Sequence, residues 1–468
     1  MLNYLPKYIS TRAIVAYFVA LVLCSFVFLG KSLDFFFMFT GALSVTSFFY
    51  LSNTLTIQWQ TIRIKTFTQK IFIIGFIVRV CWVVFSYFYY IKNTGQPFEF
   101  MAADSMGYHG GGINVKNLIL TGSFSNWDMF QKGAYSDSGF MLILGLEYIF
   151  TDDSIFWARI INALFSAYMS VLIYKIAKNN FGESTGRIAG IAAMLMPNFI
   201  YYCGLHAKET IMILLTVLFI ERIDNILRNK DFKLLSIVPA MFVGLSLFLF
   251  RTVLGVTAFI SVLAAILLAS SKKTKWGNRL ALGFCATLFI FNIVGSKIMY
   301  EIETVWEQKG TNQQIGMEGR AQRKGGNVLA KYATKSIFIP LIFTIPFPTL
   351  VNSNQPNQQI MNGANFAKNI MSFFVIFGLL MLLRKNKWRE HLLIISFLLG
   401  YLAVIGLSNF AHSERFHMPS LPFALIIASW GISQFTNRQK TWFDFWVVSM
   451  VIAAIGWNYI KLKGRGLT

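Results

Sequence analysis

Long runs of apolar residues, separated by short polar segments, dominate the pattern along this chain. The runs are about 20 residues long, which is the length of α-helix that crosses the hydrocarbon core of a bilayer. Strands of a soluble core are much shorter, so the pattern predicts an all-α, polytopic membrane protein with about thirteen transmembrane helices. The expected spans are residues 11–29, 33–53, 71–91, 154–176, 187–203, 207–226, 232–250, 253–270, 278–297, 365–384, 390–408, 416–434 and 441–460.

Composition supports the same class. Hydrophobic residues make up 55% of the chain and charged residues only 13%, about half the charged fraction of a soluble protein. The formal net charge is +22, from 42 Lys+Arg against 20 Asp+Glu. In a soluble protein this excess would suggest nucleic-acid binding, but here the basic residues occupy short loops, where they orient helices. We therefore expect the lipid bilayer, and no nucleic acid, as a partner.

The basic loops predict the orientation of the helices. If every basic cluster is cytoplasmic, the spans alternate correctly and the N-terminus is inside. The tail is the exception, because Lys461, Lys463 and Arg465 would then lie outside; either the count is off by one or the last run does not span. The clusters are Arg63, Lys65 and Lys70; Lys175, Lys178 and Arg187; Arg222, Arg228, Lys230 and Lys233; Lys272, Lys273, Lys275 and Arg279; Arg384, Lys385, Lys387 and Arg389; and Arg438 and Lys440.

Two long segments, residues 92–153 and 296–364, are then expected on the outer side. Each contains an apolar stretch, 140–150 and 337–350, that is short for a span and indicates an interfacial or re-entrant helix. Elsewhere the loops are short, so chemistry is expected where the outer loops meet the membrane surface.

The first candidate site lies about ten residues beyond the third span. Asp104, followed by Tyr108 and His109, could act as a general base at a membrane-surface cleft. The same position also suits a helix N-cap, whose carboxylate accepts backbone N–H bonds.

The second candidate site is the group His206, Lys208 and Glu209 at the outer start of the sixth span. Ionisable residues near lipid are costly and are usually functional or paired. The alternative for Glu209 is that it complements the dipole of its helix.

The third candidate site, between the eleventh and twelfth spans, contains His412 and Arg415. An arginine can hold a phosphate through two parallel hydrogen bonds, or it can extend its charge to the interface without a specific role. Arg251 between two spans, Arg159 near the outer end of the fourth span, and Arg320 in the second outer segment are similar cases. Carboxylates and cations on one face would suit an anionic lipid headgroup and the activation of a hydroxyl.

Four segments, in order, resemble motifs of the GT-C superfamily of membrane glycosyltransferases. The closest branch contains the protein O-mannosyltransferases and the bacterial lipid A aminoarabinose transferases. The stretch ADSMGYH is similar to the first outer-loop motif, which carries the catalytic base of the family. Residues 137–182 resemble the interfacial helix of the family together with the next helix, which opens with an Arg. Residues 194–215 resemble the helix pair whose second member starts with an acid. Residues 413–432 resemble the late segment that contains an Arg followed by Pro.

The resemblance implies an inverting transfer of a sugar from a polyprenyl-phosphate donor to a lipid, glycan or protein acceptor. It implies Asp104 as the base, with Glu209 orienting a substrate or Lys208. It also implies a set of residues that bind the donor phosphate and a set that lines the substrate pocket. The first set is Lys208, Arg415, Arg251, Arg320 and His412, and the second is Tyr108, His109, His206 and Arg159. Some relatives use a divalent metal at the acidic site; this sequence predicts no cofactor with certainty.

The resemblance divides the chain into four parts. These are two N-terminal transmembrane helices (1–60), a GT-C-like core (61–297) with the first outer loop (93–153), a second outer loop (298–364) and the C-terminal transmembrane helices (365–468). The expected location is the plasma (inner) membrane, with the active site on the outer face.

Two other functions fit the same pattern. An O-antigen polymerase or ligase also has about a dozen spans and an Arg-rich outer loop, and would depend on residues such as Arg320 rather than on Asp104. A transporter or flippase of lipid-linked sugars is disfavoured because the sequence has no convincing internal repeat and few ionisable residues lie in the middle of spans.

Overall fold

The structure is a computed structural model. The structure describes residues 2–127, 136–229, 233–268, 339–408, 411–463 and 465–467. Within these ranges the chain forms helices, and the only β-type pairing is an isolated bridge between Ser32 and Val351. The prediction of an all-α fold is therefore confirmed.

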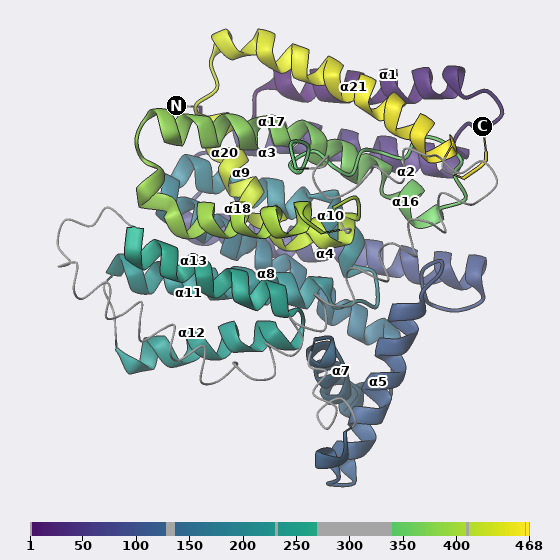
Figure 1. The fold of residues 1–468 in the computed structure, drawn as a ribbon, viewed down its shortest axis with the longest axis vertical. Helices are drawn as coiled ribbons and strands as arrows, with labels where there is room; N and C mark the ends of the chain where they lie inside the picture. Colours follow the sequence, from purple (N-terminus) through teal and green to yellow (C-terminus); the bar gives the residue numbers. More distant parts are fainter. Residues whose placement is uncertain are drawn as a thin grey trace.

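The first half of the chain contains the helices that carry the first two candidate sites (Figure 1). These helices are α1 (Lys7–Val27), α2 (Phe35–Thr46), η1 (Ser47–Leu51), α3 (Ser52–Gln58), α4 (Ile64–Thr94), α5 (Ala103–Leu120), η2 (Phe124–Asn126), α7 (Ser138–Thr151), α8 (Ile155–Phe181), α9 (Glu183–Leu195), α10 (Pro197–Cys203), α11 (Glu209–Asn229), α12 (Leu234–Ser246), η3 (Leu247–Leu249) and α13 (Thr252–Leu268).

The second half contains the helices of the third candidate site and the C-terminal helix. They are α16 (Pro356–Ile360), α17 (Asn362–Arg384), η4 (Trp388–His391), α18 (Leu392–Gly406), α19 (Glu414–His417), η5 (Met418–Ser420), α20 (Leu421–Ser433), η6 (Asn437–Gln439) and α21 (Lys440–Lys463).

Eight helices among the described residues are long and apolar enough to cross a membrane. They cover residues 7–27, 35–58, 64–94, 155–181, 362–384, 388–406, 414–433 and 437–463. A multi-pass membrane protein is thus confirmed, whereas the total of about thirteen spans stays a prediction. The expected span 278–297 lies outside the described residues, and α12 and α13 are shorter apolar helices.

One expected span is divided into two helices. The apolar run 187–203 forms α9 and α10, which are separated at Met196 because Pro197 cannot continue the helix but suits the first turn of a new one. The buried Arg79 of α4 donates to the carbonyls of Ala193 (3.2 Å) and Met194 (3.0 Å) at the end of α9. These bonds satisfy carbonyls that the break leaves without a helical partner.

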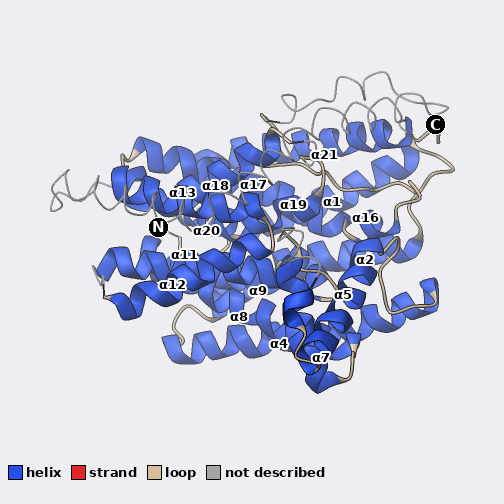
Figure 2. Cartoon of the chain, turned by 60° about the horizontal axis from the view of Figure 1, so that its bottom comes forward, coloured by secondary structure: helices blue, strands red, loops and turns tan. Residues whose placement is uncertain are grey.

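The long helices lie side by side, and α1 and α21, from the two ends of the chain, pack against each other (Figure 1). Helices α5 and α7 pack together and project from this bundle across the direction of the long helices, as both views show (Figures 1 and 2). Their expected location in the membrane interface stays a prediction. Residues 339–355 form turns and extended backbone rather than a helix.

Small residues bring α17 and α20 into close contact. A Cβ on Gly431 would lie 2.3 Å from the carbonyl oxygen of Phe374, and a Cβ on Gly378 would lie 2.6 Å from that of Ile427. Glycine at both positions therefore allows the close backbone approach that is typical of helix pairs in membranes. This contact fixes α17 relative to the short helix α19, which is joined to α20 through η5.

The helix directions place the candidate residues at one end of the bundle. The end of α4, the starts of α11, α17 and α19, and the end of α21 all lie there. The basic clusters occupy the opposite ends of these helices, at the start of α4 and at the ends of α8, α11, α17 and α20.

Candidate active site

A cavity of about 390 Å³ lies where these helix ends meet. Its wall is formed by residues 99–105 with the first turn of α5, by the segment from the end of α10 to the start of α11, and by residues 346–349. The segment from α16 to α17, residues 412–415 and Lys461 complete the wall. Side chains from five distant parts of the sequence therefore surround one space.

Arg415 connects two carboxylates at this cavity. Its Nη1 donates to Oδ2 of Asp104, and its Nε donates to Oε1 of Glu209. The Asp104 side chain is 63% exposed and that of Glu209 is 0% exposed. The structure thus brings together three residues that the sequence placed in separate candidate sites, and Asp104 is the carboxylate open to the cavity.

The alternative role of Asp104 as an N-cap is not observed. Helix α5 is capped by Ala102, and Asp104 lies in the first turn. Its carboxylate is directed to Arg415 rather than to the backbone N–H groups that a cap would bind.

Lys208 has a carboxylate partner of its own, Asp137. Its Nζ contacts Oδ1 of Asp137 and donates to the carbonyl oxygen of Phe250 at 2.7 Å. The hydroxyl of Tyr108 donates to the same Asp137 oxygen at 3.3 Å, and burial together with nearby Glu209 raises the pKa of Tyr108 to about 12. Lys208 and Tyr108 do not line the cavity; they form a second network around Asp137.

Two of the remaining predicted pocket residues form an uncharged hydrogen-bonded chain. Nδ1 of His109 is 2.7 Å from the hydroxyl of Tyr148, which is 3.1 Å from Nε2 of His206. Burial lowers the pKa of His109 and holds that of His206 well below its usual value. This chain joins α5, α7 and the segment before α11, behind the cavity wall.

Two further arginines support the wall. The buried Arg159 donates to the carbonyl oxygen of Pro97, next to residues 99–105. Arg251, at the turn between α12 and α13, stacks on Phe416 at 4.4 Å and donates to the hydroxyl of Tyr401 at 3.1 Å. Neither residue lines the cavity.

Two predicted phosphate-binding residues remain, His412 and Arg320. His412 lines the cavity beside Arg415. Arg320 lies outside the described residues.

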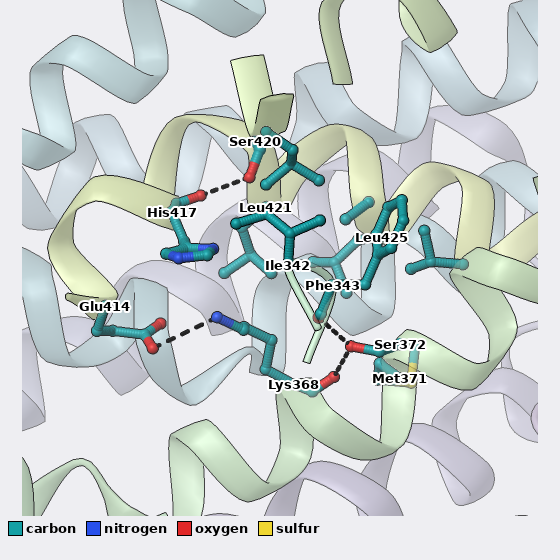
Figure 3. Close-up of a pocket in the computed structure, with 13 residues that line it drawn as sticks. Ile342, Phe343, Lys368, Met371, Ser372, Glu414, His417, Ser420, Leu421 and Leu425 are labelled. Carbon is teal, nitrogen blue, oxygen red and sulfur yellow. Dashed lines mark hydrogen bonds and ion pairs between the residues drawn. The ribbon is translucent and has the colours of Figure 1, made fainter. Parts of the chain in front are cut away.

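A smaller, mainly apolar pocket lies next to the cavity and contains a buried ion pair (Figure 3). Nζ of Lys368 is 3.6 Å from Oε2 of Glu414 and donates to the carbonyl oxygen of Ile345 at 2.6 Å. Nδ2 of Asn198 donates to Oε1 of Glu414 at 2.6 Å. The volume of about 30 Å³ has room for about two water molecules. Glu414 lines both spaces, so this pair fixes the start of α19 at their boundary.

Sequence reasoning missed several lining residues, most importantly Lys461. This residue lies in the last turn of α21, and its Nζ donates to Oγ1 of Thr349 at 2.5 Å and to Oε1 of Gln358. One sequence signal could have indicated Lys461: the basic residues of the tail fall on the expected outer side, where the positive-inside rule does not predict them. Asp137 was missed as the partner of Lys208, and no sequence signal indicates that pairing.

The described part of the chain contains no group of three or more His, Cys, Asp or Glu side chains that could hold a metal ion. Arg415 bridges two of the four acids that line the cavity, Asp104 and Glu209; the other two are Glu99 and Glu414.

The fold and this cavity define a multi-pass helical membrane protein with an ion-paired site at one end of its helix bundle. Residues 139–296 match the model of the dolichyl-phosphate-mannose-protein mannosyltransferase family, which is a GT-C-type glycosyltransferase family. The resemblance seen in the sequence is confirmed over this part of the chain, and it indicates a membrane glycosyltransferase. A comparison with curated proteins finds no match. The matched region contains Lys208, Glu209 and Arg251, whereas Asp104 and Arg415 lie outside it.

Proposed function

We propose that the protein is an inverting glycosyltransferase that moves a sugar from a polyprenyl-phosphate donor to a hydroxyl of a lipid, glycan or protein. The observation that supports this most directly is the Asp104–Arg415 pair on the wall of the cavity. It puts a carboxylate that can accept a proton beside a cation that can stabilise a departing phosphate.

The proposed site faces the outer side of the plasma (inner) membrane. The cavity lies at the helix ends opposite to the basic clusters, and such clusters remain cytoplasmic in membrane proteins. The N-terminus is then inside. A lipid-linked donor suits this side of the membrane, because it can enter the cavity laterally from the bilayer.

In the proposed reaction Asp104 accepts the proton of the acceptor hydroxyl. The acceptor oxygen attacks the anomeric carbon as the bond between that carbon and the phosphate oxygen breaks. The lipid phosphate leaves with the electron pair, so its negative charge grows in the transition state. Arg415 has five N–H donors, and two of them bind carboxylates. Its other N–H groups can stabilise the charge on the phosphate.

Glu209 is a positioning residue in this proposal. Its side chain is fully buried and holds Nε of Arg415, so it fixes the plane of the guanidinium. Lys208, Arg251, Tyr108, His109, His206 and Arg159 then support the wall rather than contact the substrate, and His412 remains a candidate contact for the phosphate.

The test is Asp104→Asn, measured as release of lipid phosphate from polyprenyl-phosphate sugars in the presence of native membranes. Loss of a general base lowers the rate by about 10²–10⁴-fold, and we expect an effect of this size with an unchanged folded yield. The matched control is Asp152→Asn, an exposed acid at φ 49°, a conformation that asparagine tolerates. Full activity of folded Asp104→Asn protein would remove the proposed base.

A further inference from the structure

The buried and half-buried cations around the cavity differ in whether a carboxylate neutralises them. Three of them have such a partner. They are Arg415 with Asp104 and Glu209, Lys208 with Asp137, and Lys368 with Glu414. Arg159 and Arg251 form no ion pair with a carboxylate among the described residues, but neither of them lines the cavity.

Lys461 has no such partner among the residues that the structure describes. Its Nζ contacts the hydroxyl of Thr349, the amide oxygen of Gln358 and, at 5.7 Å, the ring of Trp457. All three are neutral groups, and Arg465 nearby adds positive charge. Lys461 is half-buried, and an ammonium group that is partly withdrawn from water without a counter-charge is costly. Because Lys461 lines the cavity, an anion that enters this space would compensate the charge.

The position of Lys461 is fixed by bonds between α21 and the loop 348–353. Asn458 accepts from the backbone N–H of Leu350 at 2.9 Å and donates to the carbonyl oxygen of Pro348 at 3.0 Å. One turn beyond Lys461, Arg465 donates to the carbonyl oxygen of Ser353 at 2.9 Å. These hydrogen bonds therefore hold the Lys461 ammonium on the cavity wall, so that it is not a mobile surface charge.

We propose that Lys461 binds the phosphate of the lipid donor and that the end of α21 and residues 349–358 form this phosphate subsite. The proposal rests on the proposed function for the nature of the ligand. A lysine ammonium is a compact charge that donates to phosphate oxygens, and here it reaches the cavity from a different element than Arg415. It also gives Lys461 a function on the side of the membrane where the charge rule does not expect a cation.

The test measures binding of a short-chain polyprenyl phosphate to the purified full-length protein in lipid nanodiscs. Hydrogen bonds to charged groups have energies that correspond to about ten- to a hundredfold in affinity, so we expect Lys461→Met to weaken binding by this factor. Lys461→Arg should retain most of the affinity. The matched control is Lys463→Met, because Lys463 lies two residues further on the same helix and is exposed; its affinity should equal that of the unchanged protein.

A second variant, Gln358→Glu, keeps the lysine and places a carboxylate next to it. We expect it to weaken binding as Lys461→Met does, and it tests the charge even if Lys461→Met lowers the folded yield. The proposal would be overturned if Gln358→Glu, or folded Lys461→Met protein, bound the lipid phosphate with the same affinity as the control Lys463→Met.

Competition by inorganic phosphate distinguishes a site for the phosphate of a lipid from a site for free phosphate. We expect millimolar inorganic phosphate to displace little of the lipid; displacement at equal concentrations would show a site for free phosphate and overturn the lipid assignment. Binding is read without turnover, so Asp104→Asn protein should still bind the lipid phosphate through Lys461. If the unchanged protein bound the lipid phosphate through Lys461 but transferred no sugar, the proposed function would be contradicted and the phosphate subsite would stand.

Discussion

Glu414 and Arg415 follow one another at the start of α19, yet their side chains enter two different ion-pair networks. Glu414 turns to Lys368 of α17 and Asn198 of α10, where every charged member is at most 10% exposed. Arg415 turns to Asp104 and Glu209 on the cavity wall, where Asp104 is 63% exposed. We call the first network closed, because its charged members are almost fully buried although Glu414 also lines the cavity, and the second open, because its Asp104 is exposed.

The difference separates a structural role from a chemical one. The charges of an almost fully buried ion pair are neutralised by each other and by the surrounding protein, so such a pair mainly holds elements together. A pair with one exposed carboxylate can exchange a partner with a substrate. The closed network thus fixes α19 against α17, and this fixes the position of Arg415 in the open network.

The largest expected effect is on stability, in the closed network. Lys368→Met would leave Glu414 buried without its counter-charge, and removal of one member of a buried pair costs about 3–5 kcal/mol. We expect a clear fall in the free energy of unfolding in detergent micelles. The double variant Lys368→Met/Glu414→Gln should recover most of it, because no charge is then left unpaired.

The control for this comparison is Lys385→Met, at the other end of α17, where Lys385 is exposed and donates to Gln434 at 2.6 Å. It should change stability by less than about 0.5 kcal/mol. If Lys368→Met were as stable as this control, the Lys368–Glu414 network would not have the structural role assigned to it.

The second expected effect is on activity, in the open network. Arg415→Lys keeps the positive charge but cannot hold Asp104 and Glu209 through two separate nitrogens of one planar group. We expect sugar transfer to fall by about ten- to a hundredfold with little change in thermal stability, because charged hydrogen bonds of this kind are lost from the site. Arg438→Lys, an exposed residue at the opposite end of the bundle, should behave as the unchanged protein. A fall in stability without a fall in transfer would assign Arg415 to structure instead.

The sequence allowed prediction of the residues that converge at helix ends. Asp104, Glu209 and Arg415 each follow or begin a long apolar run on the same expected side, so their proximity follows from topology alone. The all-helical membrane fold follows from the same runs.

The partners of the charged residues could not be predicted. Lys208 was expected to contact phosphate, but Asp137, 71 residues away in sequence, is its neighbour in the folded chain. Tertiary packing decides which carboxylate reaches which cation, and one sequence carries no record of it. The pairing of Lys461 with neutral groups, which makes it a candidate for the phosphate, was hidden for the same reason.

The smallest expected effect concerns the uncharged chain His109–Tyr148–His206 behind the wall. Both histidines have a pKa below that of an unfolded histidine because they are buried, and Arg159 further disfavours a charge on His206. The unfolded state therefore binds more protons as the pH falls below about 6.5, and the stability that the neutral histidines contribute is present above that pH and lost below it. Hydrogen exchange of α5 and α7 should accelerate between pH 7.5 and pH 5, although Asp153 near His109 opposes part of the shift. His206→Gln should flatten this dependence, whereas His391→Gln, at the other end of the bundle, should leave it intact. An acid response confined to α19 would instead locate the sensitive charges in the ion-pair networks.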